Sequence, residues 1–198
     1  MDVIEAMETC SAARYLKPDP VPQELIERVI YAATRASSPG NSQEWDFIVV
    51  RSPETKQKIR DLLAPRFRER VGVSAGGRVT NRMIAGATHL AETLHEVPAI
   101  IFVCGPVAYP PNAPLEQFVW SALYPAAQNL IVAARALGLG TTFTTFHMFM
   151  ENELRDLLGI PREVKFGVMI PIGWPQKEFV KVKRKPLAEV IHWEKWRD

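Results

Sequence analysis

Apolar residues recur along this chain in two patterns, and each pattern predicts one kind of secondary structure. Between residues 23 and 36 they return every three or four positions, which is the spacing of one face of a helix. Short uninterrupted apolar runs, such as Phe47–Val50, have the length of buried strands. The predicted helices are residues 2–9, 23–36, a helix from 53, two pieces within 65–96, 115–137 and 151–158. The predicted strands are residues 47–50, 98–103, 141–146 and 165–172.

Proline, serine and glycine mark the boundaries of these elements. The prolines within residues 18–22 predict an extended connection, because proline fixes φ and restricts the residue before it. Ser52 and Pro53 suit the start of a helix, as its cap and its first helical residue. The glycine-rich residues 72–77 are expected to separate two helical pieces.

Segment 115–137 is apolar on nearly all sides, which sets it apart from the other predicted helices. Pro125 lies inside it and predicts a kink, and Gly138 and Gly140 suit a C-terminal cap. A helix this apolar is either central to the core or buried at a subunit interface. The whole pattern predicts an α+β fold.

Length, charge and cysteine content narrow the class of protein. With 198 residues, 47% of them hydrophobic, the chain can bury one core, so a single domain over residues 1–198 is expected. The net charge is +2, and Lys and Arg are dispersed except in residues 181–185, which argues against a nucleic-acid partner. Cys10 and Cys104 match no metal spacing and are expected to be reduced thiols. No secretory leader or bilayer-length apolar run is visible, so a cytoplasmic protein without a membrane partner is expected.

The sequence lacks the common motifs of side-chain catalysis. It has no nucleophile elbow, no zinc-protease motif, no phosphate-binding P-loop and no complete dinucleotide fingerprint. Its four histidines show no ligand spacing, so no metal site and no catalytic side chain are predicted. If the protein is an enzyme, the chemistry is expected to belong to a bound organic cofactor.

Three polar clusters remain as candidates for binding. Ser11 to Arg14 can supply a charged fork and a hydroxyl to a phosphate. The Ser37–Trp45 turn offers backbone N–H groups and short polar side chains just before an apolar run. Arg184 lies in a basic stretch. Each cluster also fits an ordinary role: a solvated arginine, a helix-to-strand connection and a basic loop.

The order of these clusters and of five further motifs resembles the FMN-dependent nitroreductase family. The resemblance extends through nearly the whole chain. The matching stretches are Thr9–Leu16, Pro18–Val21, Ser37–Trp45, Pro125–Leu130, Ala136–Thr142, Leu158–Pro161, Gly173–Pro175 and Arg184–Pro186.

The resemblance implies a nitroreductase-like fold, with a central, mainly antiparallel sheet flanked by helices. It also implies an intertwined homodimer with two FMN sites at the subunit interface. In such a dimer, helix 115–137 gains a partner, and the tail 187–196, with Ile191, Trp193 and Trp196, reaches across the neighbouring subunit.

The family's phosphate-binding pattern, Arg-x-Ser-x-Arg/Lys, implies where FMN phosphate is held. In this chain only its last member remains, as Arg14, because Cys10 and Ala12 replace the first arginine and the serine. Ser11 is expected to offset part of that loss, and Arg184 matches the family's C-terminal arginine. The phosphate contacts implied are therefore Ser11, Ala12, Arg14 and Arg184.

Two further segments are implied beside the flavin ring. The turn contributes Ser38, Pro39, Asn41 and Gln43, with Ser37 and Glu44 departing from the family's usual residues. The segment that contains Phe143, Thr144 and Thr145 is implied to aim backbone amides at the reactive edge of the ring.

The implied activity is a ping-pong oxidoreductase reaction. NADH or NADPH reduces FMN, and a small electron-poor acceptor such as a nitroaromatic or quinone then takes its place. Phe118, Trp120 and Tyr124 are candidate acceptor contacts, although aromatics at helical spacing also suit a core. Two alternatives stay open: another flavin reaction (enone reduction, reductive dehalogenation, flavin cleavage), or a flavin-binding protein without turnover.

Overall fold

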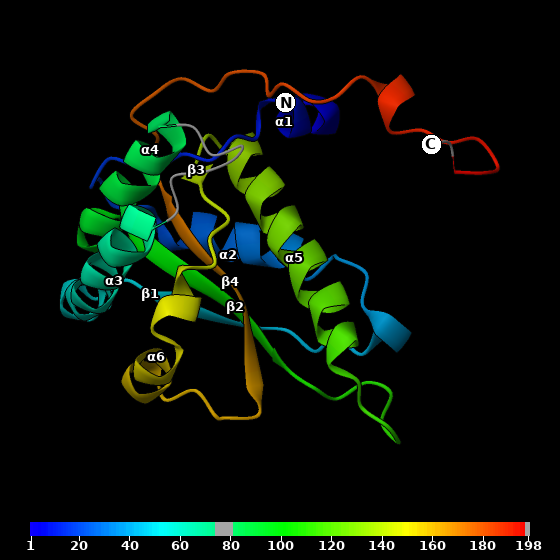
Figure 1. Ribbon diagram of the computed structural model, residues 1–198, viewed down its shortest axis with the longest axis horizontal. Helices are drawn as coiled ribbons and strands as arrows, with labels where there is room; N and C mark the ends of the chain where they lie inside the picture. Colours follow the sequence, from blue (N-terminus) through cyan, green and yellow to red (C-terminus); the bar gives the residue numbers. More distant parts are fainter. Residues whose placement is uncertain (74–80, 197–198) are drawn as a thin grey trace.

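The computed structural model describes residues 1–73 and 81–196 of the chain. Figure 1 shows a sheet with helices on both faces. The helices are α1 (Val3–Thr9), α2 (Gln23–Ala33), α3 (Pro53–Val73), α4 (Asn81–Glu92), α5 (Glu116–Ala136) and α6 (Glu151–Leu158). The strands are β1 (Asp46–Val50), β2 (Ala99–Pro106), β3 (Gly140–Thr141) and β4 (Val164–Gly173). Short 3₁₀ turns are η1 (Pro39–Asn41), η2 (Leu94–Glu96), η3 (Phe146–Phe149) and η4 (Leu187–Glu189).

The four strands form one antiparallel sheet in the order β1-β2-β4-β3. The central strand β2 is buried along nearly its whole length, and its side chains alternate between two cores. Ile101 and Val103 face the core shared with α2 and α5, whereas Ile100 and Phe102 face the core of α3, α4 and α6. This alternation follows from the period of two in a strand. The predicted α+β fold with an antiparallel sheet is confirmed.

Most predicted elements are present, but the segment 141–146 is not a strand throughout. Pairing in β3 stops after Thr141, and an isolated bridge joins Thr144 to Met169 before the chain turns into η3. Threonine favours strands, and the Thr142 and Thr144 amides still donate to the β4 carbonyls of Pro171 and Met169, while their hydroxyls donate to the carbonyls of Ala13 and Met169. The predicted linker 72–77 lies largely outside the described residues; Gly72 itself belongs to α3.

The two glycines predicted to cap α5 have different roles. Gly138 has a φ of 81° and follows the last turn of the helix, where its N–H donates to the carbonyl of Arg135. It therefore fits the predicted cap. Gly140 belongs to β3, so that part of the prediction is wrong. α5 itself buries Leu123 and Leu130 completely, while Tyr124 on its other side is 42% exposed.

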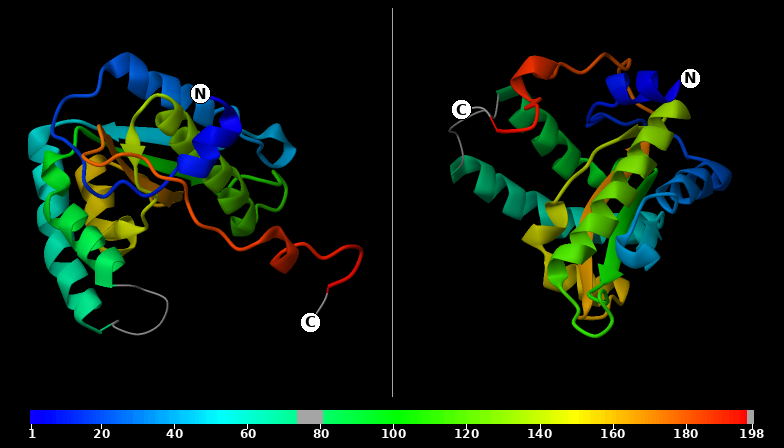
Figure 2. Two further views of the ribbon diagram at one scale, coloured as in Figure 1. Left: turned by 90° about the horizontal axis from the view of Figure 1, so that it is seen from above. Right: turned by 90° about the vertical axis from the view of Figure 1, so that its right-hand side faces the viewer.

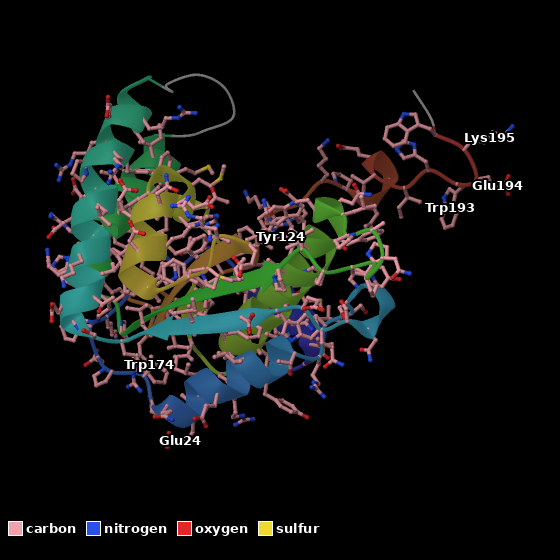
Figure 3. The ribbon with its side chains drawn as sticks, turned by 90° about the horizontal axis from the view of Figure 1, so that it is seen from below. Glu24, Tyr124, Trp174, Trp193, Glu194 and Lys195 are labelled. Atoms are coloured by element: carbon pink, nitrogen blue, oxygen red, sulfur yellow. The ribbon has the colours of Figure 1, made fainter. Side chains whose placement is uncertain are left out.

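The C-terminal segment leaves the body of the molecule as an extended tail. Its beginning is fixed to α1, because Lys181 pairs with Glu8 at 2.6 Å and the Val182 amide donates to the Glu8 carbonyl. Beyond that point the tail projects away (Figures 2 and 3), and Trp193 and Trp196 are 71% and 80% exposed. Among the described helices, none has the length and apolar character that a bilayer crossing requires.

Candidate functional site

The segment that follows α1 crosses the edge of the sheet and forms the floor of the candidate site. The Ala13 amide donates to the Thr141 carbonyl at 2.9 Å, and the Thr142 hydroxyl donates to the Ala13 carbonyl. On its other side, the Gln176 amide donates to the carbonyl of Tyr15. The N-terminal segment thus lies between β3 and the chain that follows β4.

Gly140 allows this close approach. A Cβ at this position would lie 2.7 Å from the Cβ of Ala13 and 3.0 Å from Cδ2 of Leu16. A side chain there would separate the N-terminal segment from the sheet. The glycine predicted as a helix cap is therefore a packing residue beneath the site.

A cavity of about 340 Å³ lies above this floor. Its walls come from three parts of the chain: residues 11–15, the first turns of α4, and residues 175–180. The lining residues are Ser11, Ala12, Ala13, Arg14, Tyr15, Arg82, Met83, Ala85, Gly86, Pro175, Lys177, Glu178, Phe179 and Val180. Ser11, Ala12 and Arg14, predicted from the sequence, thus lie together in one cavity.

Positive charge dominates the cavity. Arg14, Arg82 and Lys177 line it, against the single carboxylate of Glu178. Arg14 lies against α4 at Gly86, where a Cβ would be only 3.0 Å from Cδ of the arginine. Within the described residues, neither arginine has a hydrogen bond or an ion pair. The arrangement provides free cationic donors for an anion.

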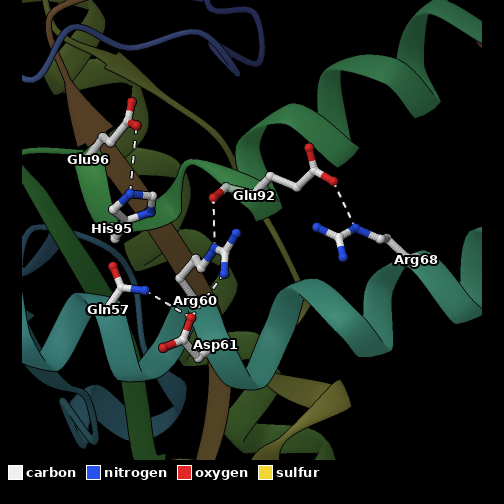
Figure 4. Close-up of polar contacts among 7 residues, drawn as sticks. All are labelled: Gln57, Arg60, Asp61, Arg68, Glu92, His95 and Glu96. Carbon is white, nitrogen blue, oxygen red and sulfur yellow. Dashed lines mark hydrogen bonds and ion pairs between the residues drawn. The ribbon is translucent and has the colours of Figure 1, made fainter.

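The α4 wall is fixed to α3 by a polar network (Figure 4). Nε of Arg60 donates to the Glu92 carbonyl at 3.0 Å, and Nε of Arg68 pairs with the Glu92 carboxylate at 2.8 Å. Arg60 also pairs with Asp61, at 3.0 Å. Exposed pairs contribute little energy, but the contacts at Glu92 hold the C-terminal end of α4 in register with α3. Gly86 and Arg82 belong to the same helix and line the cavity nearer its N-terminal end.

The Ser37–Trp45 turn lies elsewhere in the subunit. It is tightly folded: the Gln43 amide donates to the Ser38 hydroxyl, and Gly40, Asn41 and Gln43 all have a φ between 53° and 57°. Left-handed backbone at non-glycine residues is uncommon and concentrates at functional sites. Ser38, Pro39, Asn41 and Gln43 are absent from the cavity lining, and Figure 1 shows the turn beside the far end of α5, away from α4.

The segment after β3 connects with the aromatic side chains of α5. Phe143 lies 5.8 Å from Tyr124, and Tyr124 stacks on Trp120 at the same separation. We call Trp120, Tyr124 and Phe143 the aromatic patch. The third predicted acceptor contact, Phe118, packs instead against Tyr109, whose ring covers Gly40 of the turn.

Of the two threonines predicted beside the cofactor, Thr144 is buried and its side chain is already engaged. Its amide and its hydroxyl both donate to the Met169 carbonyl. Thr145 is exposed and begins η3. The amides of Phe143 and Thr145 have no acceptor among the described residues, so they remain available as donors.

Arg184 is not among the described residues that line the cavity. Its guanidinium donates to the carbonyl of the neighbouring Lys183. It does lie near Cys10, the residue that replaces the first arginine of the expected phosphate pattern. Burial raises the pKa of the Cys10 thiol, and the charges of Arg135 and Arg184 offset that shift only in part. Cys10 therefore stays a neutral thiol at pH 7.

Sequence reasoning missed Arg82 and Lys177, which line the cavity, and Gly86, which packs against Arg14. It also missed the contact between Tyr15 and Lys177. No motif contains Arg82, Gly86 or Lys177, because these residues meet only in the folded chain. The described residues contain no group of three or more His, Cys, Asp or Glu side chains placed to hold a metal ion.

Known proteins resemble this chain in sequence and in fold. The human iodotyrosine deiodinase 1 is 28% identical over 193 residues, which cover 94% of this chain and 66% of that protein. This chain therefore spans just under two thirds of the length of that relative.

Among the solved structures that share the fold are two whose ligands are known. A structure of oxidized iodotyrosine deiodinase bound to FMN and 3-iodo-L-tyrosine superposes with a TM-score of 0.82 at 20% identity, covering 98% of this chain and all of that one. The NADPH:FMN oxidoreductase of Vibrio harveyi, complexed with NAD⁺, gives a TM-score of 0.74 at 18% identity, covering 99% and 78%. The model of the nitroreductase family matches residues 9–174. The chain belongs to the nitroreductase family.

Proposed function

We propose that this protein is an FMN-dependent oxidoreductase that uses NADH or NADPH to reduce small electron-poor acceptors. The observation that carries the proposal is the cationic cavity beside β3, lined by Arg14, Arg82 and Lys177. Membership of the nitroreductase family supports it, as do the FMN-bound structure and the NADPH:FMN oxidoreductase that share the fold.

The residues present fit a phosphate-bearing cofactor. The guanidinium of Arg14 has no partner among the described residues, and the missing Cβ of Gly86 leaves space for its side chain. Ser11 adds a hydroxyl at the same wall. Two or more cations suffice for a phosphate dianion, so the loss of arginine at Cys10 and of serine at Ala12 does not remove the site.

When bound, FMN would supply the hydride chemistry, and the chain would supply binding and electrostatics. The unengaged amides of Phe143 and Thr145 are the donors that this segment can offer to negative charge on a reduced ring. The Thr144 amide cannot serve, because it already donates to Met169. No side chain is assigned as a proton donor or base.

A second copy of the chain would complete the site. In one subunit the Ser37–Trp45 turn does not line the cavity, so the predicted contacts of Ser38, Pro39, Asn41 and Gln43 require the turn of a partner. The exposed tail, with Leu187, Val190, Ile191, Trp193 and Trp196, would cover apolar surface of that partner. Acceptors would then bind near the aromatic patch.

The dimer can be tested by sedimentation equilibrium on the full chain. The subunit mass is 22.3 kDa, and we expect about twice that mass at micromolar concentration, because an extended apolar tail favours association. A monomer under these conditions would contradict the shared site.

One relative favours a second reaction. Iodotyrosine deiodinase 1 is among the proteins that this chain resembles, so reductive dehalogenation of an aromatic acceptor is the alternative within the same flavin site. Enone reduction and flavin cleavage use the same site in principle. A flavin-binding protein without turnover is the remaining alternative.

Anaerobic mixing of the FMN-loaded protein with NADH or NADPH separates these proposals. We expect the flavin absorbance to bleach within seconds, and reoxidation by nitroaromatics, quinones, enones or halophenols then identifies the acceptor class. If the flavin binds but does not bleach, the protein is not an NAD(P)H-dependent reductase. If the chain does not take up FMN, both the reductase and the flavin-binding protein without turnover are excluded.

Gly86→Ala is expected to change stability and flavin affinity in opposite directions. Alanine inside α4 should raise the free energy of unfolding by up to about 1 kcal/mol, since glycine is a poor helix former. The new Cβ would displace Arg14, at a cost of about 0.5–1.5 kcal/mol, or roughly 2- to 10-fold in FMN affinity. Urea unfolding and flavin titration measure the two effects; an unchanged affinity would contradict the placement of Arg14.

A further inference from the structure

Lys177 lines the cavity and belongs to none of the stretches that resemble the family. It follows β4 by four residues, and its side chain lines the cavity opposite α4. Its ammonium group lies 4.1 Å from the centre of the Tyr15 ring. Among the described residues no carboxylate pairs with it. The charge is thus held in place by an aromatic face and stays available to an anion.

Tyr15 connects all three walls of the cavity. Its ring also stacks on the imidazole of His89 in α4, with ring centroids 4.3 Å apart and planes inclined by 21°. The Tyr15 carbonyl accepts the amide of Gln176, next to Lys177. His89 lies three residues after Gly86, so one face of α4 receives both Arg14 and Tyr15. The column Lys177–Tyr15–His89 therefore sets the distance between α4 and the chain after β4.

The number of positive charges in the cavity indicates a role for Lys177 and its column. The expected phosphate pattern has lost an arginine at Cys10 and a serine at Ala12, and Arg184 does not line the cavity. Arg14 alone would leave a phosphate dianion half neutralised. Arg82 adds positive charge on the α4 wall, and Lys177 adds it on the opposite wall, where it lies over the Tyr15 ring. Together the three cations exceed the single carboxylate of Glu178.

We propose that Lys177 is the second phosphate-binding cation of this cavity and that Tyr15 is the residue that positions it. The proposal rests on the proposed function, because the phosphate is that of FMN. It assigns to this chain a substitute for the altered pattern at Cys10 and Ala12, in which the cation comes from near the opposite end of the sequence.

Comparing FMN with riboflavin tests the role of Lys177, because riboflavin has the same ring and ribityl chain without the phosphate. Lys177→Met should weaken FMN binding by about 10- to 100-fold, as expected for a lost charged hydrogen bond, and leave riboflavin binding unchanged. Lys177→Arg should retain most of the affinity. Lys58→Met, which removes an exposed charge on α3 outside the cavity, is the matched control and should match the parent for both ligands.

Tyr15 variants test the positioning role. Tyr15→Phe keeps the ring and should bind FMN as the parent does. Tyr15→Leu should weaken FMN binding by about three- to tenfold, as expected for a lost cation–π contact plus its stacking partner. Lys177→Met should weaken FMN binding less in the Tyr15→Leu variant than in the parent, because the two side chains act together.

Three outcomes would overturn the proposal. If Lys177→Met lowered FMN and riboflavin affinity equally, Lys177 would shape the cavity without binding the phosphate. If FMN affinity were unchanged, Lys177 would not belong to the site. Additive effects of the two substitutions would remove the role of Tyr15. A parent chain that binds neither FMN nor inorganic phosphate would overturn the proposed function as well, so the two failures are distinguishable.

Discussion

Replacing Arg14 by alanine is expected to lower FMN affinity by about 1.5–3 kcal/mol, the usual cost of losing a hydrogen bond to a charged group. Arg14 is half-buried in the cavity and free of protein partners among the described residues. The Cδ of Arg14 packs over Gly86, which restricts the side chain before an anion binds. The effect should appear as a faster loss of flavin during dialysis and a larger dissociation constant for FMN.

Two variants sharpen this experiment. Arg14→Lys keeps the charge but not the planar fork and should fall between the parent and Arg14→Ala. Arg28→Ala removes an exposed arginine of α2 that does not line the cavity and should have no effect. Riboflavin affinity should change little in all three. If Arg14→Ala retains FMN as the parent does, the phosphate lies elsewhere.

The N-terminal wall of the site could be predicted because its residues are contiguous. Ser11, Ala12 and Arg14 follow a helix end directly, and their order carried the family resemblance. Lys177 could not be predicted in this way. It reaches the cavity only because Leu16 bridges to Pro175 across the sheet edge, a contact between opposite ends of the chain.

The Ser37–Trp45 turn shows a different limit. Its residue types predicted a tight polar turn, and the left-handed backbone of Asn41 and Gln43 agrees with that. Its separation from the cavity depends on how α2 and α5 pack, which no local pattern encodes. The expected role of Ser38 and its neighbours therefore depends on a second subunit.

Local composition predicted only part of the segment Thr141–Phe146. The Thr142 and Thr144 amides still donate to β4, at the carbonyls of Pro171 and Met169, but the chain turns into η3 at Phe146. Phe143 and Thr145 alternate with these paired residues, so their amides do not donate to β4. This alternation leaves the donor segment that the family resemblance implied.

Protonation of His147 is expected to make the protein sensitive to mild acid. The imidazole is 3% exposed, its ring stacks on Phe166, and its Nδ1 has no partner among the described residues. Burial lowers the pKa of His147 to about 4, and the nearby carboxylate of Glu151 opposes the shift only in part. Arg155, which pairs with Glu151 and lies over the same phenylalanine ring, adds positive charge near the imidazole.

The direction of the pH effect follows from these values. In the unfolded chain, histidine has a pKa of about 6.5, so between pH 6.5 and 4 the unfolded state binds more protons than the folded state. The contribution of neutral His147 is fully present above pH 6.5 and is lost as the pH falls to 4. A shift of this size corresponds to about 3 kcal/mol in the free energy of unfolding.

His147→Phe should remove this part of the pH dependence, because phenylalanine keeps the ring contact with Phe166 and cannot be protonated. Urea unfolding at pH 7, 6, 5 and 4 would measure the free energy of unfolding for both proteins. Whatever offset the two show at pH 7, the variant should gain about 3 kcal/mol on the parent by pH 4. All other acid-sensitive groups are common to both chains and cancel in this difference. Parallel curves would show that His147 accepts a proton in the folded state without penalty, and the acid sensitivity would then belong to other groups.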